Sequence, residues 1–232
     1  MGFDVVVSKK SDAAIFEQGL ASVPSDTACL PAKIVHGHVK DLQDKGVDRI
    51  FMPMMISQPT ENRTIKGRSF CALIQGYPMV VDRSDEPMRR HSIAFDYPVF
   101  HWDTPALKQK QVVNWLIDNW GISRSTARAA FQQAEKADQS FNSRIREEGK
   151  ALIKQIEASE SFGVVLAGRP YHSDEFVNHN LSTFFTSLGI PVLTLDALPL
   201  EREDLKQTRL DTINSFHARV LSAAQYVAKH PK

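Results

Sequence analysis

The sequence predicts an α/β fold in which two Rossmann-like parallel-sheet halves are joined by a long helical segment. Short β-branched runs alternate with amphipathic helices near both ends of the chain, as expected for parallel strands covered by helices. Between them, helical periodicity continues from Pro105 to about residue 156. We therefore expect a first α/β part over residues 1–100, a helical bridge over residues 101–160 and a second α/β part over residues 161–232.

The composition excludes several classes of protein. The 232 residues carry 28 Lys and Arg against 27 Asp and Glu, a net charge of +1, so the chain lacks the basic surplus expected of a protein that binds nucleic acid or an anionic membrane. No apolar run approaches the roughly 18 residues of a membrane span. Since no signal peptide is evident either, we expect a soluble, cytoplasmic protein. Its two cysteines are too few for a disulfide framework.

The first part should contain one or more strand–helix–strand units. The run at residues 3–8 predicts a strand that begins almost at Met1, which suggests a piece cut from a longer polypeptide. The elements expected after it are a helix from residues 11–12 to 20, a helix from Pro31 to Gly46, a buried strand over 47–52, a loop over 57–68, a helix over 71–81, a charged turn over 83–90 and a strand over 92–95.

The remaining elements follow the same rules. The bridge should hold one helix from Pro105 to Trp120 and a second, capped by Ser123 or Ser125, with an apolar stripe at Ala127, Ala130, Phe131, Ala134, Ala137, Phe141, Ile145, Leu152 and Ile156. The elements expected beyond it are a strand over 162–167, a loop over 168–172, a helix from Ser173 or Asp174 to Gly189, a strand over 190–195 and a helix over 210–227. Two strands bury little core, so this last part should pack on the first or lack partners lost by truncation.

The two cysteines stand at helix starts. Cys29 precedes Pro31 by two residues, and Cys71 opens the helix expected over residues 71–81. Exposed N–H groups and the helix dipole at such a position lower the pKa of a thiol and favour a thiolate nucleophile or ligand. Alternatively, each cysteine is a small hydrophobic residue of the core. Both thiols could also meet at the carboxyl edge of the sheet, where open α/β sheets place their sites.

His36-Gly37-His38 suggests a zinc site together with Cys29. Helix geometry argues against it, because Cys29 and His36 are separated by ~10 Å along the axis and residues two apart point in nearly opposite directions. Gly37 inside a helix costs about 1 kcal/mol relative to Ala. Close approach of a neighbouring helix is the preferred explanation, with close approach of a ligand as the alternative.

A second candidate site follows the strand expected at residues 162–167. The loop of residues 168–172 carries Arg169, Tyr171 and His172, and Asn178 and His179 follow it. Such a loop could hold a phosphate or carboxylate at the strand ends, or its charged groups could be paired with Asp174, Glu175 or backbone carbonyls. Neither a Rossmann glycine pattern nor a P-loop occurs in the sequence.

An ordered set of motifs resembles the uncharacterised domain of large CoA-enzyme activases, proteins related to the activator and D-component of 2-hydroxyacyl-CoA dehydratases, including the 2-hydroxyglutaryl-CoA enzyme. The motifs are Ser25-Asp26, Cys29-Leu30-Pro31-Ala32-Lys33, His36-Gly37-His38, residues 46–51, Cys71 with Tyr77-Pro78, and residues 166–172. The resemblance implies an excised module, since ATPase modules usually precede this domain. Those modules supply the ATP and the bridging iron-sulfur cluster.

The family pattern has three cysteines, and the chain departs from it. Cys29 and Cys71 match the first and third, but Met54 stands at the second and Ala72 follows Cys71 where the family has proline. Three thiolates suit an iron-sulfur cluster with an open iron, and a thioether is a far weaker ligand. We therefore expect no cofactor in this chain, with a cluster on Cys29 and Cys71 as the alternative.

The resemblance gives the functional expectation. We expect a module without turnover of its own that docks or scaffolds in ATP-driven electron transfer, with the ATPase modules of its parent and an acyl-CoA dehydratase as partners. Two other functions stay open. Cys29 and Cys71 could make the chain an iron-sulfur electron carrier, or Arg169, Tyr171, His172, Asn178 and His179 could bind CoA or another anion.

Overall fold

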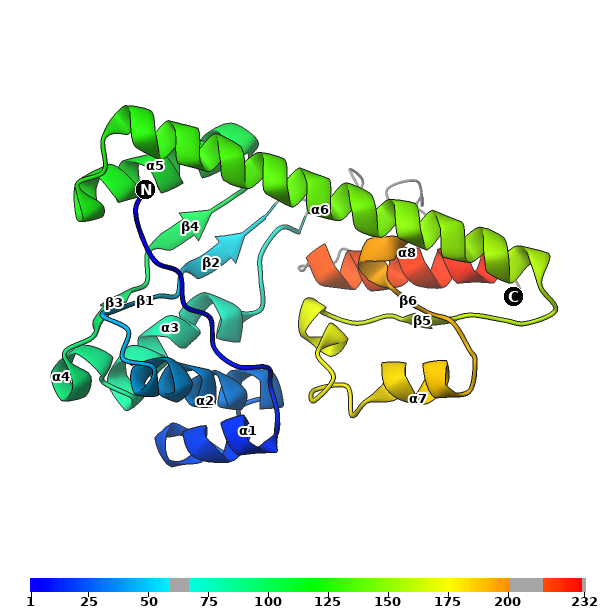
Figure 1. Ribbon diagram of the computed structural model, residues 1–232, viewed down its shortest axis with the longest axis horizontal. Helices are drawn as coiled ribbons and strands as arrows, with labels where there is room; N and C mark the ends of the chain where they lie inside the picture. Colours follow the sequence, from blue (N-terminus) through cyan, green and yellow to red (C-terminus); the bar gives the residue numbers. More distant parts are fainter. Residues whose placement is uncertain (59–66, 201–214, 231–232) are drawn as a thin grey trace. The chain divides into compact units, whose positions relative to one another are not determined.

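The computed structural model describes residues 1–58, 67–200 and 215–230 (Figure 1). The chain divides into two compact units. Unit 1 consists of residues 1–57 and 70–122, and unit 2 of residues 58–69 and 123–232. The three-part division expected from the sequence stays a prediction.

Unit 1 begins with two packed helices, α1 (Ala13–Gly19) and α2 (Leu30–Asp44), joined through the short 3-10 helix η1 (Leu20–Ser22). The Asp12 side chain accepts a hydrogen bond from the backbone N–H of Ile15 at 2.8 Å and so caps α1. Pro31 lies in the first turn of α2, and Gly46 takes a φ of +70° beyond its end. Both helices are confirmed.

The centre of unit 1 is a parallel strand pair interrupted by two prolines. Strand β1 (Arg49–Phe51) pairs with β3 (Ala94–Asp96), and β2 (Met54–Ser57) pairs with β4 (Val99–His101). Arg49 lies beside Ala94 and Met54 beside Val99, so the two pairs share one register up to Met55, after which it shifts by one residue and Ser57 lies beside His101. That register places Pro53 opposite Pro98, where neither residue has an N–H to donate.

Two helices connect these strands and confirm the strand–helix–strand unit. They are α3 (Ala72–Ser84) and α4 (Pro87–His91), and α5 (Pro105–Trp120) follows β4. The α/β class is therefore confirmed. The Rossmann-like arrangement is not, because every sheet among the described residues pairs only two strands. The apolar core of unit 1 gathers buried side chains from α2, α3, β1 and the residue before β3, namely Ala32, Val39, Ile50, Tyr77, Val81 and Ile93.

Four predictions for unit 1 need correction. Residues 3–8 are extended but form no strand, because no neighbouring strand pairs with them in the described chain. The strand expected over residues 47–52 should be buried, but in β1 only Ile50 is buried and its two neighbours are exposed. The charged turn contains the start of α4, which Pro87 begins. Strands β2 and β4 were not predicted, because each is only three or four residues long and follows a proline.

Unit 2 is built on α6 (Arg124–Ala158), a helix of 35 residues capped by Ser123. Strands β5 (Val164–Leu166) and β6 (Val192–Thr194) pair in parallel. The 3-10 helices η2 (Pro170–Ser173) and η3 (Leu195–Ala197) and the helices α7 (Leu181–Ser187) and α8 (Ser215–Lys229) complete it. Residues 59–66 of the predicted loop and the start of the predicted last helix, including Leu210 and Ile213, lie outside the described residues.

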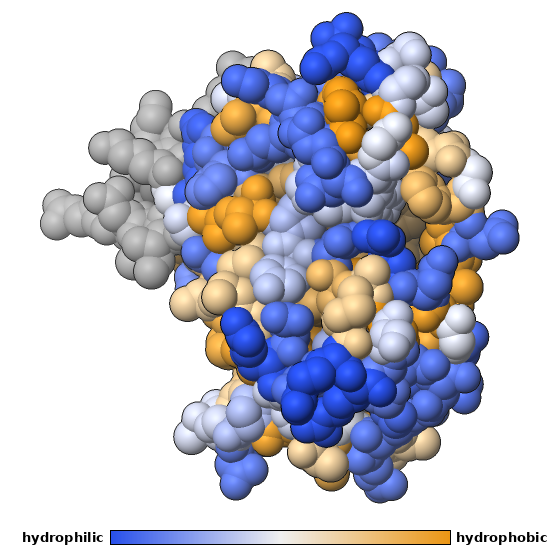
Figure 2. Space-filling model, turned by 90° about the vertical axis from the view of Figure 1, so that its left-hand side faces the viewer, coloured by the Kyte–Doolittle hydropathy of each residue, from blue (hydrophilic) through white to orange (hydrophobic). Residues whose placement is uncertain are grey.

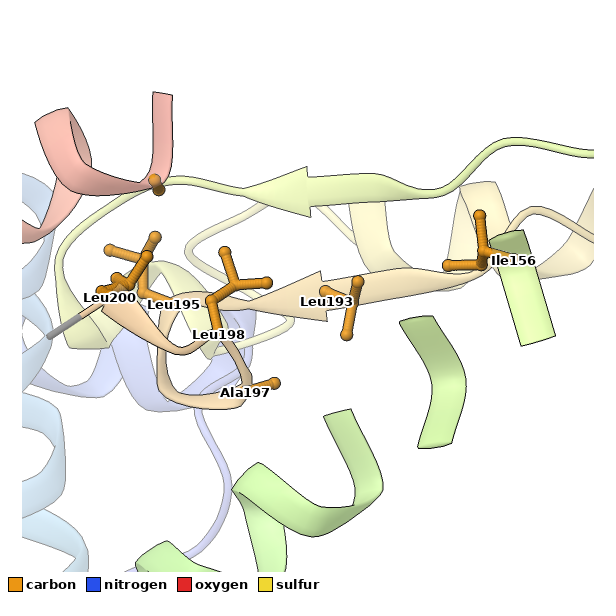
Figure 3. Packing of buried hydrophobic residues seen from close by; sticks show 7 residues of the cluster. Ile156, Leu193, Leu195, Ala197, Leu198 and Leu200 are labelled. Atoms are coloured by element: carbon orange, nitrogen blue, oxygen red, sulfur yellow. The ribbon is translucent and has the colours of Figure 1, made fainter. Parts of the chain in front are cut away.

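The core of unit 2 explains how a two-stranded sheet is stabilised. Leu195, Leu198 and Leu200 gather where the chain turns after β6, and Leu193 lies on the strand itself (Figure 3). Helices α6 and α8 cover this cluster with Ile156 and Ala223. A Cβ on Gly149 would lie 2.2 Å from the Ala197 carbonyl oxygen, so glycine permits this close approach of α6.

The predicted stripe on α6 is correct only in part. From Ile145 to Ile156 its apolar residues pack on the core. Ala134, Ala137 and Phe141 are exposed in the described structure, and Phe141 keeps 62% of its surface. The predicted helix at Ser173 or Asp174 begins only at Leu181. Asp174 instead accepts the N–H groups of Phe176 and Val177 at 3.0 and 3.1 Å, which closes a turn.

Candidate functional site

A buried polar network joins α2 to α3. His36 Nδ1 lies 2.5 Å from Asp85 Oδ2, and His36 Nε2 lies 2.9 Å from the Tyr77 hydroxyl. The His36 side chain is fully buried, and Tyr77 and Asp85 are also buried. In the neutral imidazole, Nδ1–H donates to the carboxylate and Nε2 accepts from the phenol, which satisfies all three side chains.

The electrostatics of the network favour a neutral phenol. Burial raises the pKa of Tyr77, and the electrostatic influence of the neighbouring Cys29 and Asp85 side chains raises it further. The network was missed in the sequence, because Tyr77 and Asp85 lie more than forty residues after His36. The only local sign was a histidine on the apolar face of a predicted helix.

The zinc arrangement considered for His36, His38 and Cys29 is absent from the described structure. His38 Nε2 lies 3.2 Å from the Ser11 hydroxyl, on the opposite side of α2 from the network. Gly37 packs against α1, where an added Cβ would lie 1.7 Å from the Ile15 carbonyl oxygen. The preferred explanation of Gly37, close helix packing, is therefore confirmed.

Both cysteines occupy the positions expected for them. Cys29 is the N-cap residue of α2 and Cys71 is that of α3, and neither side chain makes a capping hydrogen bond. Cys29 is exposed and Cys71 is half-buried. Met54 is the first residue of β2. No three His, Cys, Asp or Glu side chains of the described chain lie close enough together to hold a metal ion.

The loop after β5 brings part of the predicted anion site together. The backbone N–H of Arg169 donates to His172 Nδ1 at 2.9 Å, and the rings of Tyr171 and His172 are in contact. Asn178 is buried and its amide donates to the carbonyl oxygen of His172 at 3.1 Å. His179 is exposed with a φ of +55° and does not join this group of side chains.

One member of this loop site was missed. The Arg169 guanidinium donates to His217 Nε2 at 3.4 Å, and His217 lies in the first turn of α8. The helix N-terminus expected near Asp174 does not contribute, since α7 begins later. No signal in the sequence places His217 here, because the contact spans 48 residues.

An aromatic cluster in unit 1 was also missed. Phe51 of β1 contacts Trp115 and Trp120 of α5, with ring centroids 5.2 and 5.8 Å apart, and Phe3 packs on Trp120 at 4.8 Å. Phe3 and Phe51 nevertheless keep 48% and 45% of their surface exposed. We call Phe3, Phe51, Trp115 and Trp120 the aromatic cluster. The face of the molecule shown in Figure 2 is mostly hydrophilic, with hydrophobic residues in separate patches.

Polar groups border the aromatic cluster. The Trp120 indole N–H donates to Asp96 Oδ2 at 3.0 Å, and Arg49 pairs with the same carboxylate at 2.5 Å. The Arg49 guanidinium also lies over the Trp120 ring, 5.6 Å from its centroid. These contacts fix the orientation of the indole beside strand β1.

The comparison with protein families decides the identity of the chain. The family model of the CoA enzyme activase uncharacterised domain matches residues 1–198. The chain belongs to this family. No curated protein and no solved structure matches it. Among the described residues, no helix has the length and apolar character needed to cross a membrane.

The match to the activase domain covers all of unit 1 and the loop after β5. It ends before α8, so His217 lies outside it while Arg169 lies inside. The residues of this activase domain do not by themselves fit an iron-sulfur cluster. Cys29 and Cys71 supply two thiolates, and a [4Fe–4S] cluster is held by three or four.

Proposed function

We propose that this CoA enzyme activase domain is a non-catalytic docking module, which holds the ATP-hydrolysing part of an activase in an electron-transfer assembly that serves an acyl-CoA dehydratase. The observation that carries the proposal is the aromatic cluster. Phe3 and Phe51 keep 48% and 45% of their surface exposed, and Trp115 and Trp120 are only partly buried, although three of the four rings lie on a strand and a helix of the folded unit. Family membership supports a larger multidomain parent as the source of the partner.

The composition of the cluster suits a protein interface. Binding energy at interfaces concentrates in Trp, Tyr and Arg side chains that become desolvated, with polar groups around them. Trp115 and Trp120 supply the rings, and the Arg49–Asp96 ion pair supplies the polar border. Because α5 and β1 hold these groups in fixed positions, docking would cost little conformational entropy.

A second candidate function rests on the loop after β5. Arg169, His172 and His217 gather three nitrogen-bearing side chains near the carboxyl end of β5. Ligands of α/β proteins bind at that end of the strands, and a guanidinium recognises phosphate or carboxylate. This arrangement supports CoA or another anionic ligand as the alternative.

The docking proposal is tested by titrating the chain with the separately produced ATP-hydrolysing part of a CoA enzyme activase in a calorimeter. We expect binding, and we expect Phe51→Ala to weaken it about tenfold, since truncation of an interface aromatic costs 1–2 kcal/mol or more. Phe141→Ala is the matched control, because Phe141 has the same side chain and is more exposed, at 62% against 45%, but lies on α6. Equal affinity of the Phe51→Ala and Phe141→Ala proteins would contradict the assignment.

A further inference from the structure

Residues 3–8 are an extended segment with the composition of a strand but without a strand partner. Val5, Val6 and Val7 follow Phe3 and Asp4, and β-branched and aromatic residues favour strands. Val5 and Val7 keep 84% and 75% of their surface exposed. Within the described residues, the backbone groups of residues 4–6 make no hydrogen bond to another part of the chain. Such a row of free N–H and C=O groups can pair with another strand.

The segment is held in place at both ends. Phe3 packs on Trp120, and the Val7 carbonyl oxygen accepts a hydrogen bond from Lys45 Nζ at 2.7 Å. The backbone N–H of Lys9 donates to the buried Asp41 carboxylate at 2.9 Å. All of these contacts lie within unit 1. The strand-forming residues are therefore presented at a fixed position, which lowers the entropy cost of pairing.

We propose that residues 3–7 pair with the same residues of a second copy of the chain, as antiparallel strands related by a twofold axis through Val5. This register places Phe3 opposite Val7 and Asp4 opposite Val6. Aromatic and β-branched residues form favourable cross-strand pairs. The two Asp4 carboxylates lie on opposite sides of the axis and do not face each other.

The neighbouring twofold registers are less favourable. An axis through Asp4 would set the two carboxylates directly opposite each other, and like charges at that position are destabilising. An axis through Val6 would set Phe3 opposite Lys9, whose backbone N–H already binds Asp41. Because two short strands alone are marginally stable in water, the dimer is expected to be weak and concentration-dependent.

Disulfide trapping tests the register directly. Val5→Cys and Val7→Cys are compared in a Cys29→Ser, Cys71→Ser background, since serine is a favoured N-cap residue at both native positions. Opposite residues of antiparallel strands have Cα atoms about 4.5–5.5 Å apart, within the range of a disulfide. In this register the two copies of position 7 would be roughly 14 Å apart along the strands, too far for a disulfide.

We expect oxidation to give a linked dimer at least tenfold faster for Val5→Cys than for Val7→Cys. Light scattering should show that the mean mass of the unmodified chain rises with concentration and that Val5→Pro, which removes an N–H, stays monomeric. Equal oxidation rates, a faster Val7→Cys reaction or a monomer at every concentration would overturn the proposal. Trapping and light scattering use the chain alone, without the ATP-hydrolysing part of an activase, so their outcome is independent of the docking test.

Discussion

His36 Nδ1 and Asp85 Oδ2 lie 2.5 Å apart in the interior of unit 1, so a fully buried histidine of α2 is held by the residue that ends α3. Tyr77 completes this network through its hydroxyl. A buried polar group without a partner costs about 1–3 kcal/mol, so a network in which every member is satisfied fixes one packing of the two helices.

Removal of the Tyr77 hydroxyl should therefore destabilise the protein. Tyr77→Phe leaves His36 Nε2 without its partner, and we expect the free energy of unfolding to fall by about 1–3 kcal/mol in urea titrations. Tyr97→Phe is the matched control, because the half-buried Tyr97 donates to Asp82 at 3.1 Å near the surface, and its loss should be smaller. Combined with Asp85→Asn, Tyr77→Phe should be non-additive. An additive pair would show that the three side chains do not act together.

Two glycines in helices should respond to alanine with opposite signs. Gly37→Ala places a methyl group against the Ile15 carbonyl, and we expect a loss of about 1–3 kcal/mol as α1 and α2 separate. Gly76 lies inside α3 with nothing within 4 Å of an added Cβ. Gly76→Ala should therefore raise the free energy of unfolding by about 0.5–1 kcal/mol. A neutral Gly37→Ala would refute the close approach of the two helices.

Acid should weaken the attachment of the N-terminal segment. The Lys45 ammonium and the Lys9 N–H donate hydrogen bonds to Asp41 and hold the pKa of its carboxyl below the usual range. A lowered pKa in the folded state contributes stability above the ordinary value of about 3.9, and this contribution is lost as the pH falls below it. Asp41→Asn should flatten this part of the stability profile. Glu86 also has a lowered pKa and contributes to the pH dependence of both proteins. The quantity to compare is therefore the difference in free energy of unfolding between the unmodified protein and Asp41→Asn at each pH.

Measurement of iron binding distinguishes the docking function proposed for this chain from the alternative function as an electron carrier. After reconstitution with iron and sulfide without oxygen, we expect a nearly colourless protein without stoichiometric iron, because two thiolates do not complete a cluster site. Met54→Cys restores the second cysteine of the family pattern, giving three thiols in all, and should raise iron retention. About four irons per unmodified chain, with stable visible absorbance, would support the carrier instead.

Arg169→Lys distinguishes a structural role of the loop from anion binding. We expect a small loss of stability, about 0.5–1 kcal/mol, because lysine does not reproduce the guanidinium contact with His217. Calorimetric titration with millimolar CoA should give no heat with either protein. Heat with the unmodified chain that Arg169→Lys abolishes would favour the anion-binding function.

The local sequence was sufficient to predict those helices and strands that are marked by caps, prolines or apolar spacing. Asp12 and Ser123 cap α1 and α6, Pro31 and Pro105 lie in the first turns of α2 and α5, and both cysteines stand at helix starts as expected. Periodicity likewise located β1, β3, β5 and β6. These predictions succeed because caps, prolines and apolar spacing act through neighbouring residues.

Tertiary structure alone decided the sites. His36 meets Tyr77 and Asp85, Arg169 meets His217, and Phe51 meets Trp115, each across dozens of residues. Residues 3–8 illustrate the same limit, because their β-branched sequence favours a strand, but a strand forms only where another strand pairs with it. Side chains far apart in sequence become neighbours only when helices pack and strands pair, and no local propensity specifies which of them will meet.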